Sequence, residues 1–280
     1  MIIYHKSSDL TSHTETEKKN GKTIGFVPTM GALHEGHMSL IERSLGENDI
    51  TVCSIFVNPT QFNNKTDFEK YPKTTVQDVQ FLEEAGCHIL FLPDVEEIYP
   101  PGFASEHFEL GELENILEGA YRPGHFQGVC MVVERLLTLV PSTTLFLGKK
   151  DYQQCMVIQK LIELKSIPTK LVLCETKREI DGLAMSSRNM RLNPEERTQS
   201  RSIFETLTFM KNQLDSKPFE EIEKLAKQKL ELAGFEVDYV RITDVQLQNI
   251  EKKKENSKII GLIAATINGI RLIDNLTLAE

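Results

Sequence analysis

The sequence has few cysteines, and none are spaced as a metal or redox clamp. Its five cysteines stand at positions 53, 87, 130, 155 and 174, with no Cys-x-x-Cys pair among them. The count is odd, and most of these residues lie inside apolar segments. We therefore expect buried, reduced cysteines in a cytoplasmic protein rather than a disulfide framework or a cysteine-based zinc site.

Two further absences concern membranes and nucleic acids. No stretch approaches the roughly 18 consecutive apolar residues that a transmembrane helix needs, and the apolar start of the chain is too short for a signal peptide. The net charge of −9 at pH 7 disfavours sequence-independent binding of nucleic acid, which requires a basic face, although a local basic patch is still compatible with it. We expect neither a membrane nor a nucleic acid as a partner.

The sequence does contain a strong alternation of strand and helix patterns up to residue 176. Apolar, β-branched runs predict strands at 23–27, 50–57, 88–93, 143–148 and 169–176. Helical spacing predicts helices at about 33–45, 74–86, 129–140 and 150–165. Residues 1–176 are therefore predicted to form an α/β domain, a Rossmann-like doubly wound parallel sheet. The irregular stretch 94–127 is expected to be a functional loop or a small insert.

The pattern changes after residue 176. Two amphipathic helices are expected over 194–214 and 218–234, and strands over 235–243, 258–267 and 270–275. Asn268-Gly269 has the composition of a two-residue hairpin turn between the last two strands. Residues 177–280 are therefore predicted to be a smaller α+β C-terminal domain, which we expect to act as a lid.

The segment His34-Glu35-Gly36-His37 stands where a buried strand gives way to a helix. Unpaired N–H groups and the positive dipole end favour anions such as phosphate at a helix start. Histidines three residues apart lie on one helix face, and Gly36 lets a ligand approach the backbone. Two partly buried structural histidines are the alternative. A metal site would need a further carboxylate or cysteine at a suitable spacing, and none is evident.

The residues around this segment resemble a known family. The resemblance extends over "FVPTMGALHEGHMSLI" (26–41), "FVNPTQF" (56–62), "YPKT" (71–74), "EGAYRPGHFQGV" (118–129), "GKKDYQQ" (148–154) and "REIDGLAMSSRNMRL" (178–192). In this order, these blocks resemble the pantoate–β-alanine ligases (pantothenate synthetases) of the HxGH nucleotidyltransferase superfamily. The resemblance covers most of residues 24–192, and the tail after Leu192 carries little motif.

The resemblance implies a two-step reaction. The carboxylate of pantoate attacks the α-phosphate of ATP and releases pyrophosphate, and the amine of β-alanine then attacks the pantoyl adenylate, giving pantothenate and AMP. The sequence suits this chemistry, since it contains no nucleophile elbow, paired carboxylates or catalytic triad. A substrate carboxylate that is itself the nucleophile needs positioning and charge stabilisation instead.

The resemblance also assigns residues to ATP. His34 and His37 hold the triphosphate and stabilise charge at the α-phosphorus, Lys150 contacts phosphate, and Ser186, Ser187 and Arg188 bind the leaving pyrophosphate; these six are the expected catalytic residues. The expected ATP site also includes Pro28, Thr29, Met30, Gly31, Gly36, Gly148, Asp151, Lys177 and Met185. A lysine at a helix start faces the positive end of the helix dipole, which is unfavourable for a cation. The position of Lys150 therefore favours a functional role over a purely structural one. Asp151 also fits an ordinary helix cap.

The expected binding site for pantoate and β-alanine comprises Met30, Asn58, Gln61, Arg122, His125 and Gln154. Amides suit the hydroxyls and carboxylate of pantoate because they both donate and accept hydrogen bonds. Mg²⁺ is expected with the phosphates. Asp78 is its candidate protein ligand, directly or through water, although an acidic residue in a first helical turn also complements the dipole. The family further suggests a homodimer.

Two other functions remain compatible with parts of the sequence. Another nucleotidyltransferase of the superfamily, acting on phosphopantetheine or nicotinamide mononucleotide, would explain His34 and His37 but not Gln61 or Gln154. A non-catalytic nucleotide sensor would not need every charged site position to be filled, as it is here. The sequence also departs from the family at Glu175-Thr176-Lys177, where relatives carry Pro-Thr-Val, so the adenine pocket is expected to differ in detail.

Overall fold

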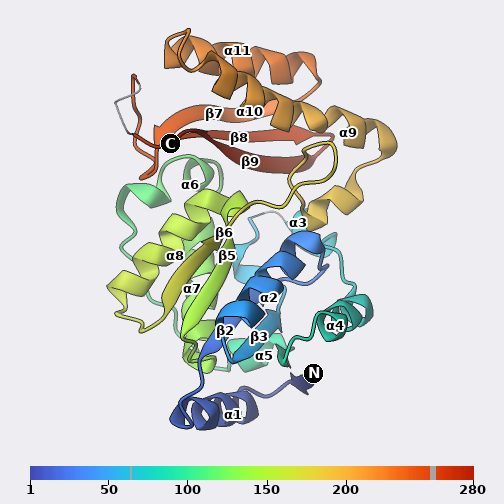
Figure 1. The fold of residues 1–280 in the computed structure, drawn as a ribbon, viewed down its shortest axis with the longest axis vertical. Coiled ribbons are helices and arrows are strands. Elements are labelled where there is room, and N and C mark those ends of the chain that lie inside the picture. Colours follow the sequence, from blue (N-terminus) through green and yellow to red (C-terminus); the bar gives the residue numbers. More distant parts are fainter. Residues whose placement is uncertain (64, 253–256) are drawn as a thin grey trace. The chain divides into compact units, whose positions relative to one another are not determined.

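The computed structural model describes residues 1–63, 65–252 and 257–280, which group into two compact units (Figure 1). The first unit comprises Met1–Gly148 and Gln154–Glu175, and the second comprises Lys149–Gln153 and Thr176–Glu280. The chain therefore passes from the first unit into the second twice. The single domain boundary predicted from the sequence instead places Lys149–Gln153 with the first domain.

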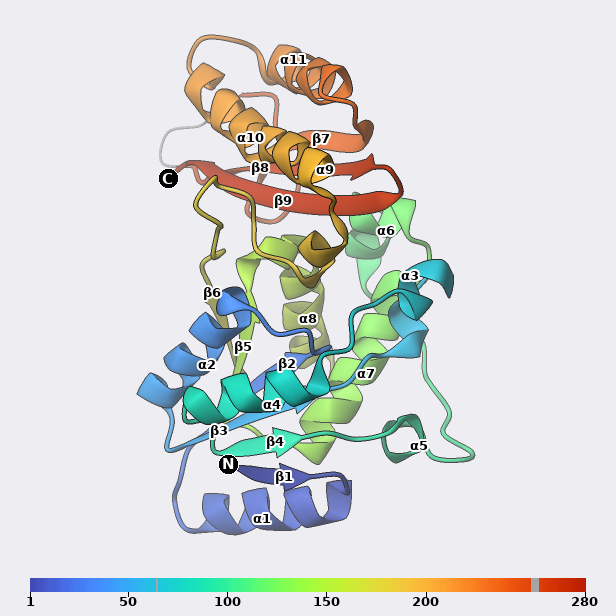
Figure 2. The same cartoon turned by 90° about the vertical axis from the view of Figure 1, so that its right-hand side faces the viewer.

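The first unit is built on a six-stranded sheet in the order β1-β4-β3-β2-β5-β6. Its strands are β1 (Ile2–Tyr4), β2 (Ile24–Thr29), β3 (Ile50–Ile55), β4 (Ile89–Phe91), β5 (Thr144–Gly148) and β6 (Lys170–Cys174). Every neighbouring pair is parallel. The doubly wound parallel sheet predicted from the alternating pattern is confirmed (Figure 2).

Helices connect the strands. They are α1 (Ser7–Lys19), α2 (Glu35–Glu47), α3 (Lys65–Glu69), α4 (Thr75–Glu84), α5 (Val95–Ile98), α6 (Glu118–Tyr121), α7 (His125–Leu139) and α8 (Tyr152–Leu164). Three short 3-10 turns accompany them, η1 (Pro59–Gln61), η2 (Gly111–Glu114) and η3 (Lys149–Asp151). The stretch 94–127 thus contains the small elements α5, η2 and α6 between irregular segments.

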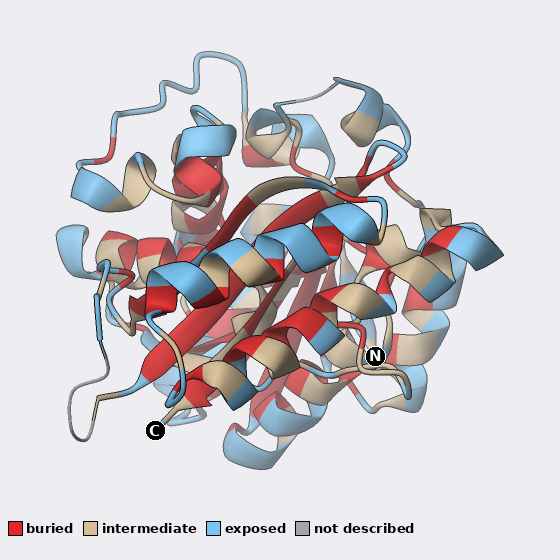
Figure 3. Ribbon diagram, turned by 90° about the horizontal axis from the view of Figure 1, so that it is seen from above, coloured by how far each residue is buried: buried red, intermediate tan, exposed pale blue. Residues whose placement is uncertain are grey.

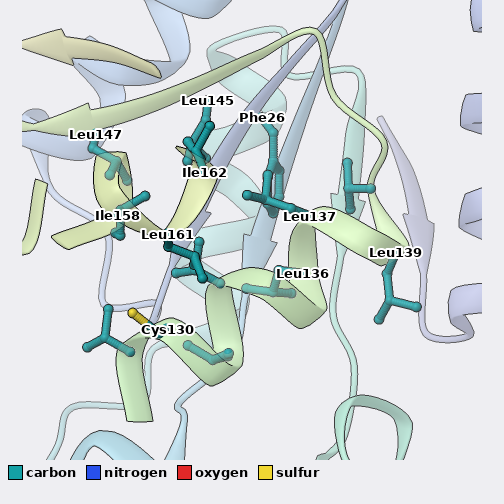
Figure 4. Close-up of a cluster of buried hydrophobic side chains, with 14 of the residues drawn as sticks. Phe26, Cys130, Leu136, Leu137, Leu139, Leu145, Leu147, Ile158, Leu161 and Ile162 are labelled. Atoms are coloured by element: carbon teal, nitrogen blue, oxygen red, sulfur yellow. The ribbon is translucent and has the colours of Figure 1, made fainter. Parts of the chain in front are cut away.

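Side-chain alternation along the strands gives the sheet two buried faces. Val27 and Cys53 pack with residues of α2 and α4, whereas their neighbours Phe26 and Val52 pack with α1, α7 and α8. Successive strand residues point to opposite faces, so continuous apolar strands require helices on both sides. Figure 4 shows part of the face covered by α7 and α8, with Phe26 close to Leu137 of α7.

The first strand and helix were not predicted. β1 has only three residues, too few for an alternating pattern, and it pairs in parallel with β4. Helix α1 is mostly polar and buries only Leu10 and Thr14. Tertiary packing at the edge of the sheet, rather than a local pattern, determines both elements.

The second unit contains a three-stranded antiparallel sheet in the order β7-β8-β9. The strands are β7 (Glu236–Asp244), β8 (Ile259–Ile267) and β9 (Ile270–Ala279), and the helical elements are η4 (Ser187–Arg191), α9 (Pro194–Gln199), α10 (Arg201–Gln213) and α11 (Phe219–Leu232). Asn268 and Gly269 both have positive φ, which confirms the predicted hairpin turn. The single helix expected over 194–214 is divided at Ser200, whose hydroxyl donates to the Glu196 carbonyl.

Burial follows the same logic in both units (Figure 3): strands are largely buried, and the helices alternate between buried and exposed residues. The core of the second unit joins Ile203 and Leu207 of α10 and Ile222 of α11 to one face of the sheet. Within the described ranges, no helix has both the length and the apolar character needed to cross a bilayer.

Candidate active site

The loop from β2 to α2 leaves the carboxyl edge of the sheet in a constrained conformation. Gly31 has φ +78° and Ala32 has φ +49°. A Cβ on Gly31 would lie 3.0 Å from a methyl carbon of Ile55 and 3.1 Å from Oδ2 of Asp78. Thr29 closes the turn, since its Oγ1 accepts the Gly31 N–H at 3.2 Å and donates to the Ser54 carbonyl at 2.8 Å. The positive φ and the close neighbours together explain why glycine occupies position 31.

His34 and His37 lie together at the start of α2. Their ring centroids are 4.0 Å apart. His34 is the N-cap residue, and its Nδ1 accepts the Gly36 N–H at 3.1 Å, while Nδ1 of His37 accepts the His34 N–H at 3.3 Å. Two backbone donors at the mouth of the helix are thus satisfied by the two imidazoles in a reciprocal cap.

This cap assigns a tautomer to each ring. A nitrogen that accepts an N–H cannot itself carry a hydrogen, so the neutral rings of His34 and His37 carry theirs on Nε2. An Nε2–H is a hydrogen-bond donor, which is the role that a phosphate oxygen requires. Both neutral rings therefore carry an Nε2–H donor, and both lie at the positive end of a 13-residue helix.

Asp78 holds the loop that leads to these histidines. It lies in the first turn of α4 and is only 2% exposed. Its Oδ2 accepts the Ala32 N–H at 3.0 Å, and its Oδ1 accepts the Leu33 N–H at 2.8 Å and the Thr74 hydroxyl at 3.0 Å. Thr74, the residue before α4, therefore donates to Asp78 and makes no side-chain capping bond to the helix backbone.

These contacts bear on the predicted magnesium ligand. Three protein donors occupy most of the accepting capacity of the Asp78 carboxylate, and its burial leaves little room for a hydrated cation. Among the residues that the structure describes, no group of three histidine, cysteine or acidic side chains could hold a metal ion. The residues present therefore do not fit a magnesium ion bound directly to Asp78.

Four of the predicted substrate residues converge on Gln61, in the turn η1 after β3. Nε2 of Gln61 lies 3.3 Å from the Met30 sulfur, and its Oε1 accepts from the Asn58 amide at 3.1 Å. The Gln61 carbonyl accepts from Nδ1 of His125 at 2.8 Å and from Arg122 at 3.4 Å. Because a carbonyl can only accept, His125 carries its hydrogen on Nδ1, whereas His34 and His37 carry theirs on Nε2.

Asn58 is a structural centre of this group. It is 1% exposed, and its Oδ1 accepts hydrogen bonds from the Tyr99 hydroxyl at 2.8 Å and from the hydroxyl of Thr60 at 3.0 Å. Its amide also donates to the Gly128 carbonyl at 3.3 Å. With its polar atoms engaged in this way, Asn58 fixes the Gln61 side chain.

The remaining predicted residues of the first unit lie at the same edge of the sheet or just beyond it. Pro28 is on β2, and Gly148 is the last residue of β5. The Gly148 carbonyl accepts from the Cys155 thiol at 3.5 Å. Gln154 is on α8, at the point where the chain re-enters the first unit.

The other predicted ATP residues belong to the second unit. Lys150 and Asp151 are in η3, with Nζ of Lys150 3.7 Å from Oδ1 of Asp151. Lys177 and Met185 are joined by a backbone hydrogen bond of 3.0 Å. The expected catalytic residues Ser186, Ser187 and Arg188 open η4, where Ser186 Oγ caps the turn by accepting the Arg188 N–H at 3.3 Å.

A buried ion pair that no sequence motif indicated anchors this loop. Arg178 makes two hydrogen bonds to Asp274 of β9, at 2.6 and 3.1 Å, and its guanidinium lies 4.4 Å from the centre of the Phe204 ring. Burial raises the pKa of Asp274, and the hydrogen bond and charge of Arg178 oppose that rise. The partners are 96 residues apart in sequence, so no local pattern could have revealed the pair.

Comparison with known proteins shows which family the chain is similar to. A sequence model described as "Pantoate-beta-alanine ligase" matches residues 2–277. The pantothenate synthetase of Flavobacterium psychrophilum is 44% identical over 281 residues, covering 99% of this chain and 100% of its own. The crystal structure of pantothenate synthetase from Thermus thermophilus has a TM-score of 0.93 at 37% identity, covering 100% of both chains. The pantoate-β-alanine ligase of Francisella tularensis, crystallised with "Beta-gamma ATP" and β-alanine, has a TM-score of 0.83 at 38% identity, covering 99% of this chain and 98% of its own.

Proposed function

The chain belongs to the pantoate–β-alanine ligase family, whose activity joins pantoate to β-alanine as pantothenate, and we propose that it does so with ATP through a pantoyl adenylate. The observation that carries this mechanism is the reciprocal cap of His34 and His37. It fixes two rings that carry Nε2–H donors at a helix N-terminus, and donors fixed before the reaction stabilise developing charge without reorganising.

In the first step, an oxygen of the pantoate carboxylate forms a bond to the α-phosphorus of ATP. The bond from that phosphorus to the bridging oxygen breaks, and pyrophosphate leaves with the electron pair. His34 and His37 donate to the phosphate oxygens on which charge accumulates. No protein nucleophile takes part, so the rate depends on alignment and electrostatics.

Pantoate binding is assigned to the group centred on Gln61. Its amide both donates and accepts, as the hydroxyl and carboxylate groups of pantoate require. Asn58 fixes the Gln61 side chain, while His125 and Arg122 hold its backbone carbonyl. Met30 supplies an apolar contact beside the same amide. Gln154 is assigned to pantoate by the family resemblance alone.

In the second step, the amine of β-alanine attacks the acyl carbon of the adenylate. The carbon–oxygen bond to AMP breaks, AMP leaves, and the nitrogen loses a proton as the amide forms.

The phosphate oxygens are assigned to the cations Lys150 and Arg188 and to the hydroxyls of Ser186 and Ser187. Arg188 offers a planar fork of donors, whereas Lys150 acts as a point charge.

The remaining expectations about partners stay predictions. Mg²⁺ would supply charge neutralisation when it accompanies ATP phosphates, and the bonds of Asp78 to backbone N–H groups make its carboxylate a poor direct ligand. The homodimer and the cytoplasmic location likewise rest on family resemblance and composition.

A reactant-omission assay tests the proposal. With ATP, pantoate and β-alanine all present, we expect pantothenate, AMP and pyrophosphate in equal amounts. With β-alanine omitted, pyrophosphate should appear only up to the amount of enzyme, because the adenylate stays bound. Formation of ADP and phosphate in the complete mixture would refute adenylate chemistry.

A further inference from the structure

Two adjacent residues of β9, Asp274 and Asn275, have side chains that point to opposite faces of the sheet. Asp274 shares its face with Ile270, Leu272 and Leu278, which belong to the core beneath α10 and α11. Consecutive strand residues alternate, so Asn275 points away from that core. The two residues therefore reach two different segments of the second unit.

Asp274 ties down the loop that contains Lys177 and the Ser186–Arg188 segment. Its carboxylate, 3% exposed, binds Arg178 through both oxygens. Arg178 also donates to the Asn275 carbonyl at 3.0 Å and to the Gly182 carbonyl at 3.0 Å. The loop is bonded further within itself, since the Asn189 amide donates to the Ala184 carbonyl at 3.0 Å.

Asn275 ties down the turn that contains Lys150. Its amide nitrogen donates to the carbonyls of Lys149 and Lys150, both at 2.8 Å. The Tyr152 hydroxyl adds a third bond, to the Val245 carbonyl at 3.0 Å. These bonds are consistent with the grouping of Lys149–Gln153 with the second unit, although Gly148 and Gln154 on either side belong to the first.

We infer that Asn275 is a positioning residue that fixes Lys150 relative to the Lys177–Arg188 loop, so that the phosphate-binding groups of the second unit behave as one rigid set. The two anchor points are consecutive residues of one strand, which keeps their separation constant. This inference rests on the proposed role of Lys150 at the phosphates. Asn275 acts through Lys150 and touches no reactant itself.

Substitutions at position 275 test the inference. Asn275→Ala removes both hydrogen bonds to the turn, and Asn275→Asp replaces the donor with an acceptor facing two carbonyl oxygens. If the alanine variant does not fold, Asn275→Thr takes its place, because threonine has a high strand propensity. Asn212→Ala is the matched control, since Asn212 is an exposed residue of α10 in the same unit.

The measurements are kcat and KM for ATP and for pantoate, from pyrophosphate release. We expect Asn275→Ala to lower kcat/KM for ATP about tenfold and Asn275→Asp to lower it further, while KM for pantoate stays within about twofold. In a double-mutant cycle, Asn275→Ala should add almost nothing to Lys150→Ala. Full multiplication of the two losses, or unchanged ATP kinetics in Asn275→Ala, would overturn the inference.

Hydrogen exchange separates this inference from the proposed function. The amides of residues 149–153 should exchange faster in Asn275→Ala than in the wild type or in Asn212→Ala, whatever the activity. If Lys150→Ala retained full activity, the phosphate role of Lys150 would be wrong, and faster exchange would still support the anchoring. Unchanged exchange in this turn would contradict the anchoring, even if Lys150 proved essential.

Discussion

The carboxylate of Asp78 accepts the backbone N–H of Leu33 at 2.8 Å, across 45 residues of sequence. The bond joins the first turn of α4 to the loop that leads from β2 into the histidine pair. Asp78 also accepts the Ala32 N–H, so two consecutive peptide groups are held by one side chain. The position of His34 therefore depends on a neighbouring helix as well as on its own.

Asp78→Asn should impair adenylate formation by disturbing this loop. An amide has one accepting oxygen, so its nitrogen would face one of the two N–H groups and leave a buried donor unsatisfied. We expect a loss of about 2 kcal/mol in the free energy of unfolding and at least about tenfold in kcat. Urea unfolding and pyrophosphate release would measure the two effects.

The magnesium dependence distinguishes this role from metal ligation. If Asp78 positions the loop, the Mg²⁺ concentration that gives half-maximal rate should be the same in wild type and in Asp78→Asn. Glu84→Gln, at the exposed end of α4, is the control and should change neither stability nor rate appreciably. A large rise in the required Mg²⁺ in Asp78→Asn alone would restore the direct-ligand interpretation.

His34→Asn should separate helix capping from phosphate binding. Asparagine is a strong N-cap residue, so the free energy of unfolding should change by less than about 0.5 kcal/mol. The variant lacks the Nε2–H donor, and we expect adenylate formation to fall by about a hundredfold.

His37→Ala should reduce adenylate formation similarly, with a larger effect on stability because the bond from the His34 N–H is lost. Single-turnover measurement of pyrophosphate release, beside thermal unfolding, would test both variants. A His34→Asn enzyme with near wild-type turnover would show that the ring serves only as a cap.

Gly128→Ala should raise the KM for pantoate. A Cβ at this position of α7 would lie 2.4 Å from the Thr60 carbonyl oxygen, so η1 and Gln61 would have to move. Overpacking of this kind costs about 1–3 kcal/mol, and we expect pantoate binding to weaken about tenfold. Steady-state kinetics with varied pantoate would measure it.

Gly46→Ala is the matched control for this substitution. Gly46 lies in α2 with nothing within 4 Å of an added Cβ, so alanine should raise the free energy of unfolding by up to about 1 kcal/mol. An unchanged pantoate KM in Gly128→Ala would mean that α7 does not position Gln61.

The buried thiols predict a specific alkaline behaviour. Burial raises the pKa of Cys87 to about 11 and of Cys130 to about 12. In the unfolded chain these thiols ionise near pH ~8.5. Their contribution to stability is therefore fully present below that pH and is lost as the pH rises toward about 11 to 12.

Urea unfolding between about pH 8 and 10 should accordingly show a declining midpoint. The decline should be smaller in a double variant that carries Cys87→Ala and Cys130→Ala. In the native protein, Cys174 should react first with a thiol reagent because it is only partly buried. Rapid native reaction of all five thiols would contradict the burial that underlies this prediction.

The long periodic elements of the fold follow directly from the sequence. The strands near β2, β3 and β5 and the helices near α2, α7 and α8 were predicted because apolar spacing and sheet burial reinforce each other. The polar helix α1 and the three-residue strand β1 lack that agreement, since they depend on packing at a sheet edge.

The sequence indicated which residues form the candidate site, but it did not indicate how they are held. The two histidines and Gln61 stand in recognisable motifs, whereas the bonds of Asp78, Asn58 and Asn275 join segments far apart in the chain. Such contacts depend on the folded arrangement of helices and strands, so local spacing cannot predict them. For this reason the sequence led to a prediction of Asp78 as a metal ligand, whereas its hydrogen bonds in the structure favour a role in holding the loop between β2 and α2.

The most direct test of the central claim is isotope exchange between pyrophosphate and ATP. If a pantoyl adenylate forms at the His34–His37 pair, labelled pyrophosphate should enter ATP when enzyme, ATP and pantoate are present without β-alanine. Omission of pantoate should abolish the exchange, and His37→Ala should reduce it at least about a hundredfold. Exchange that proceeds without pantoate, or that survives intact in His37→Ala, would contradict the account.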